Sequence, residues 1–293
     1  TNEYIQYDGN GGVKLDSFLT KLLMAIKFGD VKILLSSDIT TDSKIQFNRN
    51  IRDRIKKITP FLMLDSDPYL VIKDGKLFWI QDAYTVTGNY PYSQKIKGIN
   101  YIRNAVKVVV DAYNGDVTYY VIDNDPLMQV YSRIFPNQFK SFEEFTLKDH
   151  IRYPEDLFKI QSMIYSTYHM DDITVFYNKE DAWEIPTEIY GTGQQIQVEP
   201  YYIIMKLPQE EKEEFVLMTT FTPIKKDNMI SWLAARSDGD QYGKLLLYKF
   251  PKDKLIFGPL QIEARIDQDS EISQQITLWS QQGSRVTRGN LLV

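Results

Sequence analysis

The stretch VKVVVDAYNGDVTYYVI, residues 106–122, decides the fold class because two apolar runs flank a turn sequence. Both runs are rich in Val and Tyr, which favour strands. Asn114 and Gly115, between the runs, tolerate the positive φ angles of tight hairpin turns. We therefore predict an antiparallel hairpin that turns at Asn114-Gly115.

Similar short apolar runs lie on both sides of this hairpin. Upstream they are FLML (61–64), YLVI (69–72) and KLFWI (76–80); downstream they are YYIIMKL (201–207), FVLMTTF (215–221), SWLAA (231–235) and KLLLYKF (244–250). Their length and their β-branched and aromatic residues are typical of strands. Residues 260–266 stay open, since apolar alternation favours a strand whereas Pro259 suits the first turn of a helix.

The first sixty residues have a helical pattern instead. Leu15, Leu19, Leu22, Leu23 and Ile26 fall on one helical face, and Ile51, Ile55 and Ile58 do so in a second helix that Pro60 should end. We expect an α+β fold, with a helical N-terminal segment followed by strand-rich, mostly antiparallel lobes. Gly, Thr, Gln and Pro residues between 184 and 200 place a lobe boundary there, giving residues 1–184 and 185–293, or a single domain.

Two copies of the pattern D-x-D-P follow apolar runs, at Asp65–Pro68 and Asp123–Pro126. Asp before Pro is a typical helix start, because the carboxylate accepts from free amides and Pro lacks the amide that would be unused. The alternative is a calcium site, which needs about 6 to 8 oxygen ligands. Pro154 predicts a further helix start, with Leu157, Ile160 and Ile164 on its buried face.

Composition narrows the function. The net charge of −5 argues against a general nucleic-acid binder, which needs a basic surface. The absence of Cys and the presence of only His150 and His169 predict no zinc, iron or other cofactor. No apolar run approaches the ~18 residues that cross a bilayer. The N-terminus does not resemble a signal peptide, so we expect a piece of a longer protein.

Polar aromatic residues are concentrated in the short sequence motifs DAYT, YPYS and NYIRNAV, which begin at Asp82, Tyr90 and Asn100. Tyr84, Tyr90, Tyr92 and Arg103, with Trp183, would suit a sugar or peptide ligand, because flat rings offer apolar faces and polar tips donate hydrogen bonds. We predict that the three tyrosines and Arg103 approach one another. The alternative is ordinary packing of an aromatic-rich core.

Three further groups are candidates for chemistry or binding. His150 and His169 have acidic neighbours in sequence, as a general base often does. Asp171, Asp172 and Asp181 are the candidate carboxylates of a hydrolase that would act on envelope carbohydrate or peptide. The basic run Arg49, Arg52, Arg54, Lys56 and Lys57 is typical of a solvated helix face, or of one that meets anionic lipid headgroups.

Several short sequence motifs occur in order along the chain: DAYT, NYIRNAVKV, RYPEDLF (from Arg152), FYNKEDAW (from Phe176), YGKLLLYKFPK (from Tyr242), GPLQIEARID (from Gly258) and GSRVTRGNLL (from Gly283). They resemble the bacterial uncharacterised protein family 0182. The resemblance implies the extracytoplasmic part of a multispanning cell-membrane protein, with membrane segments outside this chain and an unknown envelope ligand or protein partner. The family name states no function. We expect a binding or interaction domain, with the hydrolase as the alternative. The last residues, Asn290–Val293, have the pattern of a strand.

Overall fold

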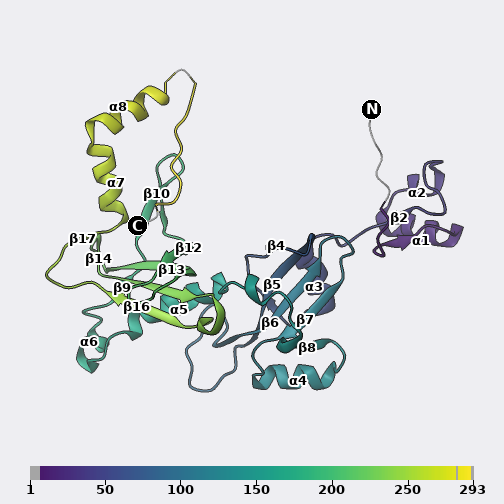
Figure 1. Ribbon diagram of the computed structural model, residues 1–293, viewed down its shortest axis with the longest axis horizontal. Helices are drawn as coiled ribbons and strands as arrows, with labels where there is room; N and C mark the ends of the chain where they lie inside the picture. The colour runs from purple at the N-terminus through teal and green to yellow at the C-terminus, as the bar shows by residue number, and fades with distance from the viewer. Residues whose placement is uncertain (1–6, 282, 292–293) are drawn as a thin grey trace. The chain divides into compact units, whose positions relative to one another are not determined.

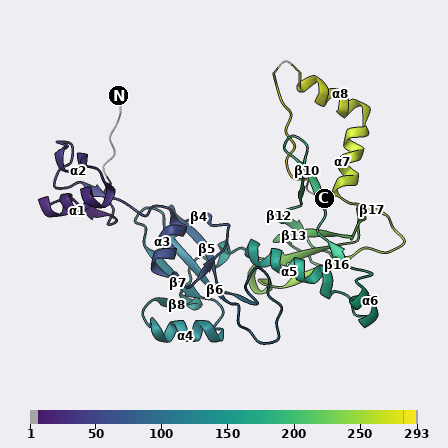
Figure 2. The same ribbon diagram turned by 180° about the vertical axis from the view of Figure 1, so that it is seen from behind.

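A computed structural model describes residues 7–281 and 283–291, and the chain divides into two compact units, residues 1–147 and 148–293 (Figures 1 and 2). The predicted α+β fold is confirmed, since each unit contains helices and a mostly antiparallel sheet. No helix among the described residues is long and apolar enough to span a membrane. The strand predicted at the C-terminus includes residues 292 and 293, which lie outside the described residues.

A six-stranded sheet forms the centre of the first unit, in the order β3-β5-β6-β7-β8 with β4 also paired to β5. Its strands are β3 (Met63–Leu64), β4 (Tyr69–Lys73), β5 (Lys76–Thr87), β6 (Tyr101–Asp111), β7 (Val117–Val121) and β8 (Phe139–Ser141). All pairs are antiparallel except β7 with β8. The runs FLML, YLVI and KLFWI therefore supply strands as predicted.

The predicted hairpin is confirmed in β6 and β7. Val110 lies opposite Val117 and Val106 opposite Val121, so the two apolar runs pair in register. The amide of Gly115 donates to the carbonyl of Asp111 at 2.8 Å, and Gly115 has φ of 77°. This left-handed conformation explains why the turn needs glycine there.

Helices α3 (Ile51–Ile58) and α4 (Pro126–Ile134) pack on one face of this sheet (Figure 1). Ile55 of α3 and Met128 of α4 are fully buried against a row of valines from β6, namely Val106, Val108 and Val110. Helix α3 ends at Ile58, before Pro60, as predicted. The core of the first unit is thus the layer between these helices and the sheet.

The N-terminal part of the unit consists of β1 (Val13–Lys14), α1 (Phe18–Phe28), α2 (Lys32–Leu35) and β2 (Lys44–Ile45). Helix α1 contains Leu19, Leu22, Leu23 and Ile26 of the predicted helical face, whereas Leu15 lies before its N-cap, Ser17, and is buried. Its apolar side, however, is largely exposed to solvent: Phe18, Leu19 and Ile26 are 74%, 64% and 71% exposed. Only Ala25 of this helix is buried.

The two D-x-D-P segments have different structures. Asp125 caps α4, where its Oδ1 accepts from the amide of Met128 at 2.9 Å and Pro126 occupies the first turn, as predicted. The helix predicted after Asp65 is wrong, because β4 follows Pro68. Asp65 instead accepts the amide of Asp67 in a local turn, and the alternating residues 69–73 continue as a strand.

A five-stranded sheet of order β12-β13-β15-β16, with β9 paired to β13, forms the centre of the second unit. Its strands are β9 (Trp183–Glu184), β12 (Tyr201–Lys206), β13 (Glu213–Pro223), β15 (Ser231–Arg236) and β16 (Leu245–Lys249). Two smaller pairs join β10 (Thr187–Tyr190) to β11 (Gln194–Gln197) and β14 (Asn228–Met229) to β17 (Ile256–Phe257). The four runs predicted downstream of residue 200 are therefore strands.

Four helices belong to the second unit: α5 (Glu155–Tyr168), α6 (Ile173–Asn178), α7 (Pro259–Gln268) and α8 (Ser270–Trp279). Helix α5 begins after Pro154, as predicted, but its buried side chains are Phe158 and Ser162, while Ile164 is 40% exposed. Residues 260–266, for which the sequence allowed either a strand or a helix, are helical, with Pro259 in the first turn of α7.

Residues 148–184 pack with the second unit, because α5 lies against β9 and β13. The sequence prediction had placed them with the first lobe. The stretch 184–200, where the composition predicts a lobe boundary, contains the hairpin of β10 and β11.

We predict that Asp125→Ala lowers the free energy of unfolding by about 2–3 kcal/mol. The carboxylate caps α4 and also accepts from the hydroxyls of Thr85 (2.9 Å) and Tyr101 (2.6 Å), so its loss leaves buried donors unsatisfied. Asp123→Ala is the matched control, because this exposed carboxylate in the same motif should change stability by less than about 0.5 kcal/mol. Urea unfolding followed by circular dichroism compares the two. Equal effects would contradict the assigned cap.

Candidate functional site

The predicted aromatic residues differ widely in their exposure to solvent. Tyr84 is fully buried in β5, whereas Tyr92 is fully exposed in the loop between β5 and β6. Tyr90 is 52% exposed and stacks on Tyr101, with ring centroids 5.4 Å apart. Arg103 is exposed on β6. Burial in the sheet thus directs Tyr84 away from solvent, where Tyr92 lies. The approach of Arg103 to the three tyrosines stays a prediction.

Trp183 lies in the second unit and stacks on His169, with ring centroids 3.6 Å apart. The Nδ1 of His169 is 3.1 Å from the carbonyl oxygen of Tyr165, and its Nε2 is 3.0 Å from that of Asp181. Both ring nitrogens thus face backbone acceptors, and the side chain is 7% exposed. This geometry fixes the ring between α5 and β9 and leaves neither nitrogen open to a ligand. His150 is half-buried in a short 3-10 helix, Lys148–His150.

The three carboxylates considered for hydrolysis lie around α6. Asp172 caps this helix, where its Oδ1 accepts from the amides of Thr174 (2.8 Å) and Val175 (2.9 Å). Asp171 and Asp181 are exposed. Across residues 7–281 and 283–291, no group of three or more Cys, His, Asp or Glu side chains has a metal-binding arrangement. Hydrolysis by paired carboxylates stays a prediction.

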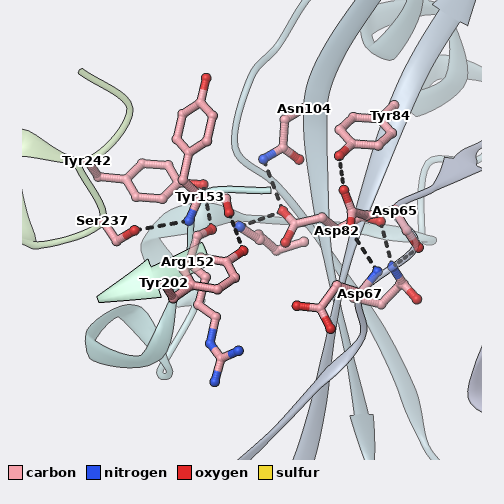
Figure 3. A network of polar contacts seen from close by, with 12 residues as sticks. Asp65, Asp67, Asp82, Tyr84, Asn104, Arg152, Tyr153, Tyr202, Ser237 and Tyr242 are labelled. Carbon is pink, nitrogen blue, oxygen red and sulfur yellow. Dashed lines mark hydrogen bonds and ion pairs between the residues drawn. The ribbon is translucent and has the colours of Figure 1, made fainter. Parts of the chain in front are cut away.

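A buried ion pair joins the two central strands of the first unit, and its acidic member, Asp82, is labelled in Figure 3. Lys107 of β6 lies directly opposite Asp82 of β5, and its Nζ is 2.5 Å from Oδ1 of Asp82. The side chains are 0% and 2% exposed. Burial opposes the charge on Lys107, but the negative charge of Asp82 outweighs it, so the pKa of Lys107 lies above its usual value. The contact between Nζ of Lys107 and Oδ1 of Asp82 therefore links the two strands inside the core.

Further hydrogen bonds surround this pair (Figure 3). Asn104 donates to Oδ1 of Asp82 at 3.0 Å. The hydroxyl of Tyr84 donates to the carboxylate of Asp65, which also accepts the amide of Asp67 at 2.9 Å. Each of these carboxylates thus has protein donors on it. We assign the Asp65–Tyr84 and Asp82–Lys107 groups to structural roles.

Tyr101 and Asp125 form a related contact at the far end of β6. The Tyr101 hydroxyl donates to Oδ2 of Asp125 at 2.6 Å. Burial and this hydrogen bond raise the pKa of Tyr101 to about 12. The phenol therefore stays protonated at neutral pH and acts as a donor.

The second unit has its own polar cluster, also in Figure 3. The backbone of Tyr153 is held twice: its amide donates to Oγ of Ser237 at 3.1 Å, and its carbonyl accepts from the hydroxyl of Tyr202 at 2.6 Å. The hydroxyl of Tyr242 donates to the carbonyl of Arg152 at 3.3 Å. These contacts fix the segment that leads into α5.

A cavity of about 520 Å³ in the first unit is the candidate binding site. It lies beside α3, and its wall includes Arg49, Arg54, Lys57, Trp79, Asp111 and Gly115. The sequence predicted that the basic run Arg49–Lys57 is a solvated helix face, and it did not predict this cavity. The turn at Asn114-Gly115 was visible in the sequence, but its position beneath α3 depends on long-range packing.

The family model described as Uncharacterised protein family (UPF0182) matches residues 1–279. The chain belongs to this family. It is 55% identical to a UPF0182 protein of Pelotomaculum thermopropionicum over 294 residues, which cover 99% of this chain and 32% of the relative. It is 55% identical to one of Methanospirillum hungatei over 302 residues, which cover 100% of this chain and 33% of the relative. A UPF0182 protein of Trichodesmium erythraeum is 51% identical over 315 residues, covering 100% and 34%.

This UPF0182 chain therefore spans about a third of the length of the curated relatives that it matches. No solved structure matches it. The family resemblance that the short sequence motifs indicated is therefore confirmed.

We predict that Lys107→Met lowers the free energy of unfolding by about 3–5 kcal/mol at pH 7, because Asp82 would be buried without its cation. Burial raises the pKa of Asp82, so the loss should shrink as the pH falls towards about 4, where the unfolded carboxyl also takes up its proton. Chemical unfolding at several pH values measures both effects.

Lys76→Met is the control, since Lys76 is exposed on the same sheet and should have an effect below about 0.5 kcal/mol. The double variant Asp82→Leu/Lys107→Met should recover much of the stability, because no buried charge is left. A Lys107→Met variant as stable as the unaltered protein would contradict the buried pair.

Proposed function

We propose that this chain is an extracytoplasmic binding or interaction domain of a membrane protein, and that α1 contacts the surface of the bilayer. One observation carries the proposal, the apolar face of α1. Phe18, Leu19, Leu22, Leu23 and Ile26 cover an arc of about 140° in the helical projection, and all except the half-buried Leu22 are exposed. A helix on a globular protein ordinarily turns such a stripe towards its core.

The lysines near this face support a lipid surface as the partner. Lys14, Lys27 and Lys32 are exposed around α1, against the exposed carboxylates Asp16 and Asp30. Between residues 13 and 58 the chain has ten Lys and Arg residues and five Asp, although the whole chain has a net charge of −5. Apolar side chains flanked by cations favour the interface of a membrane with anionic lipids.

The length of the relatives is compatible with a membrane attachment outside this chain. About two thirds of each relative lies beyond the matched segment, and such a length has room for membrane-spanning helices. The two units have their own cores, as expected of a folded domain that such segments would carry.

Labelling of introduced cysteines tests the location of the chain, because the sequence has no Cys. In the longer natural protein, Tyr92→Cys places a thiol at a fully exposed position. We expect a membrane-impermeant maleimide to label it in intact cells as strongly as in lysed cells. The unaltered longer protein gives the background. Ser162→Cys is the buried control and should react only after denaturation. Labelling of Tyr92→Cys only after lysis would refute the extracytoplasmic location.

Vesicle flotation tests the bilayer contact. We predict that the purified chain floats with vesicles of phosphatidylglycerol and phosphatidylethanolamine, and that Ile26→Glu reduces the bound fraction at least about tenfold, since burial of one Ile contributes roughly 1.5–3 kcal/mol. Ile72→Glu changes an equally exposed Ile on β4, 67% against 71%, and should leave flotation unchanged. Equal flotation of both variants would contradict a role for α1.

A further inference from the structure

The cavity beside α3 has a strongly cationic wall. Arg49, Arg54 and Lys57 line it, and Asp111 is its one acidic lining residue in the part of the chain described. One oxygen of that carboxylate is engaged in the hairpin turn, where Oδ1 accepts from the amides of Tyr113 (2.8 Å) and Asn114 (2.7 Å). Among residues 7–281 and 283–291, none of the three cations forms an ion pair. The wall therefore has an excess of positive charge that the protein does not neutralise locally.

The fold holds two of these cations in place. Asn48, in the left-handed conformation with φ of 52°, accepts from both: its carbonyl from Nη1 of Arg54 at 3.3 Å, and its Oδ1 from Nζ of Lys57 at 2.5 Å. Two cations one helical turn apart are thereby tied to a single residue. Such fixation lowers the entropy that the side chains would lose on binding a ligand.

Gly115 brings the hairpin turn against the guanidinium group. A Cβ at this position would lie 2.7 Å from Cζ of Arg54, so a larger residue would displace the group. The same glycine has φ of 77°, which the turn requires. The planar guanidinium is thus positioned by backbone that the sheet itself fixes, as expected of a preformed site.

The cavity also has an apolar part. Trp79 of β5 and Ile51 of α3 line it, and both are only partly buried. An indole face accommodates a flat or apolar group, while guanidinium and ammonium groups bind oxyanions through charge-assisted hydrogen bonds. At about 520 Å³ the cavity is large enough for a small organic molecule and too small for a macromolecule.

We propose that this cavity is a binding site for a small phosphate-bearing ligand, with its oxyanion on Arg54 and Lys57 and its apolar part towards Trp79. Three cations against one partly engaged carboxylate favour a multiply charged phosphate over a single carboxylate. The site is separate from the apolar face of α1, so it does not depend on the membrane contact proposed above. Both a soluble phosphate ester and a phospholipid headgroup have the required chemistry.

Isothermal titration of the purified chain with inorganic pyrophosphate tests the proposal. We expect saturable 1:1 binding that weakens as salt is raised, because salt screens the partly exposed cations. Arg54→Gln and Lys57→Gln should each weaken it at least about tenfold, as loss of a charge-assisted hydrogen bond does. Lys56→Gln is the matched control: Lys56 is an exposed cation of the same helix, outside the cavity wall, and its loss should change affinity less than twofold.

Variants that alter folding are identified by circular dichroism and thermal unfolding before titration. If Arg54→Gln does not fold, the exposed residues Lys57 and Arg49 decide the outcome through their own Gln substitutions. The absence of saturable binding, or equal weakening by Lys56→Gln and Lys57→Gln, would overturn the proposal.

A second experiment distinguishes a soluble phosphate ester from a phospholipid headgroup. It uses the Ile26→Glu variant, which lacks the proposed contact of α1 with the bilayer. Flotation with phosphatidylglycerol vesicles that is lost on Arg54→Gln would assign the site to a lipid headgroup. Pyrophosphate binding without flotation would assign it to a soluble phosphate compound. Absence of both would refute the site even if the cysteine labelling confirms the extracytoplasmic location.

Discussion

The pairing of β5 with β6 is the constraint on which the first unit depends, and the buried Asp82–Lys107 pair fixes it. The two residues lie directly opposite each other with almost no exposure, so each satisfies the other's charge. A slip of one residue would turn Lys107 towards the layer under α3 and leave Asp82 without a cation. Because an unpaired buried charge costs several kcal/mol, the alternative registers are strongly disfavoured.

This register determines the position of the cavity. It places Trp79 opposite Val110, and it puts the end of β6 and the turn at Gly115 beside α3. Valines on the same face of β6 bury Ile55, so α3 is held with Arg54 over that turn. The cationic wall is therefore a consequence of sheet register and helix packing together, although Arg49, Arg54 and Lys57 all lie within the nine residues that follow Asn48.

Local sequence was sufficient to predict elements with a strong pattern of their own. The hairpin of β6 and β7, the strands at the other apolar runs and the start of α5 could be predicted, because apolar period and turn residues act over a few positions. The short strands β8 and β9 have no such pattern. The two D-x-D-P segments still have different structures. Asp65–Pro68 and Asp123–Pro126 differ only at the second position, but the residues after them alternate in one case and have helical spacing in the other. The residues that follow the motif decide whether it caps a helix.

Sites were less predictable, because they depend on which face a side chain occupies and on what packs against it. Tyr84 lies only eight residues before Tyr92, yet Tyr84 is buried beside Asp65 while Tyr92 is fully exposed. The periodicity of α1 predicted an amphipathic helix but not the direction of its apolar stripe. Periodicity measures the separation of apolar and polar faces, and it contains no information on the partner.

The distribution of ion pairs indicates where a charged partner would bind. In the second unit, Arg236 pairs with Glu210 and Glu214, Arg288 with Glu263 and Asp267, and Lys159 with Glu155 and Glu199. These cations are neutralised within the fold, and hydrogen bonding to the carboxylates raises the pKa of Arg236 and Arg288 further. Arg54 and Lys57 of α3 are held instead by an uncharged residue, Asn48. An unneutralised positive potential attracts anions over distances of about a Debye length, roughly 8–10 Å at physiological salt. The cavity beside α3 therefore has the electrostatics that the proposed anionic ligand requires, whereas Arg236, Arg288 and Lys159 are neutralised by carboxylates of their own unit.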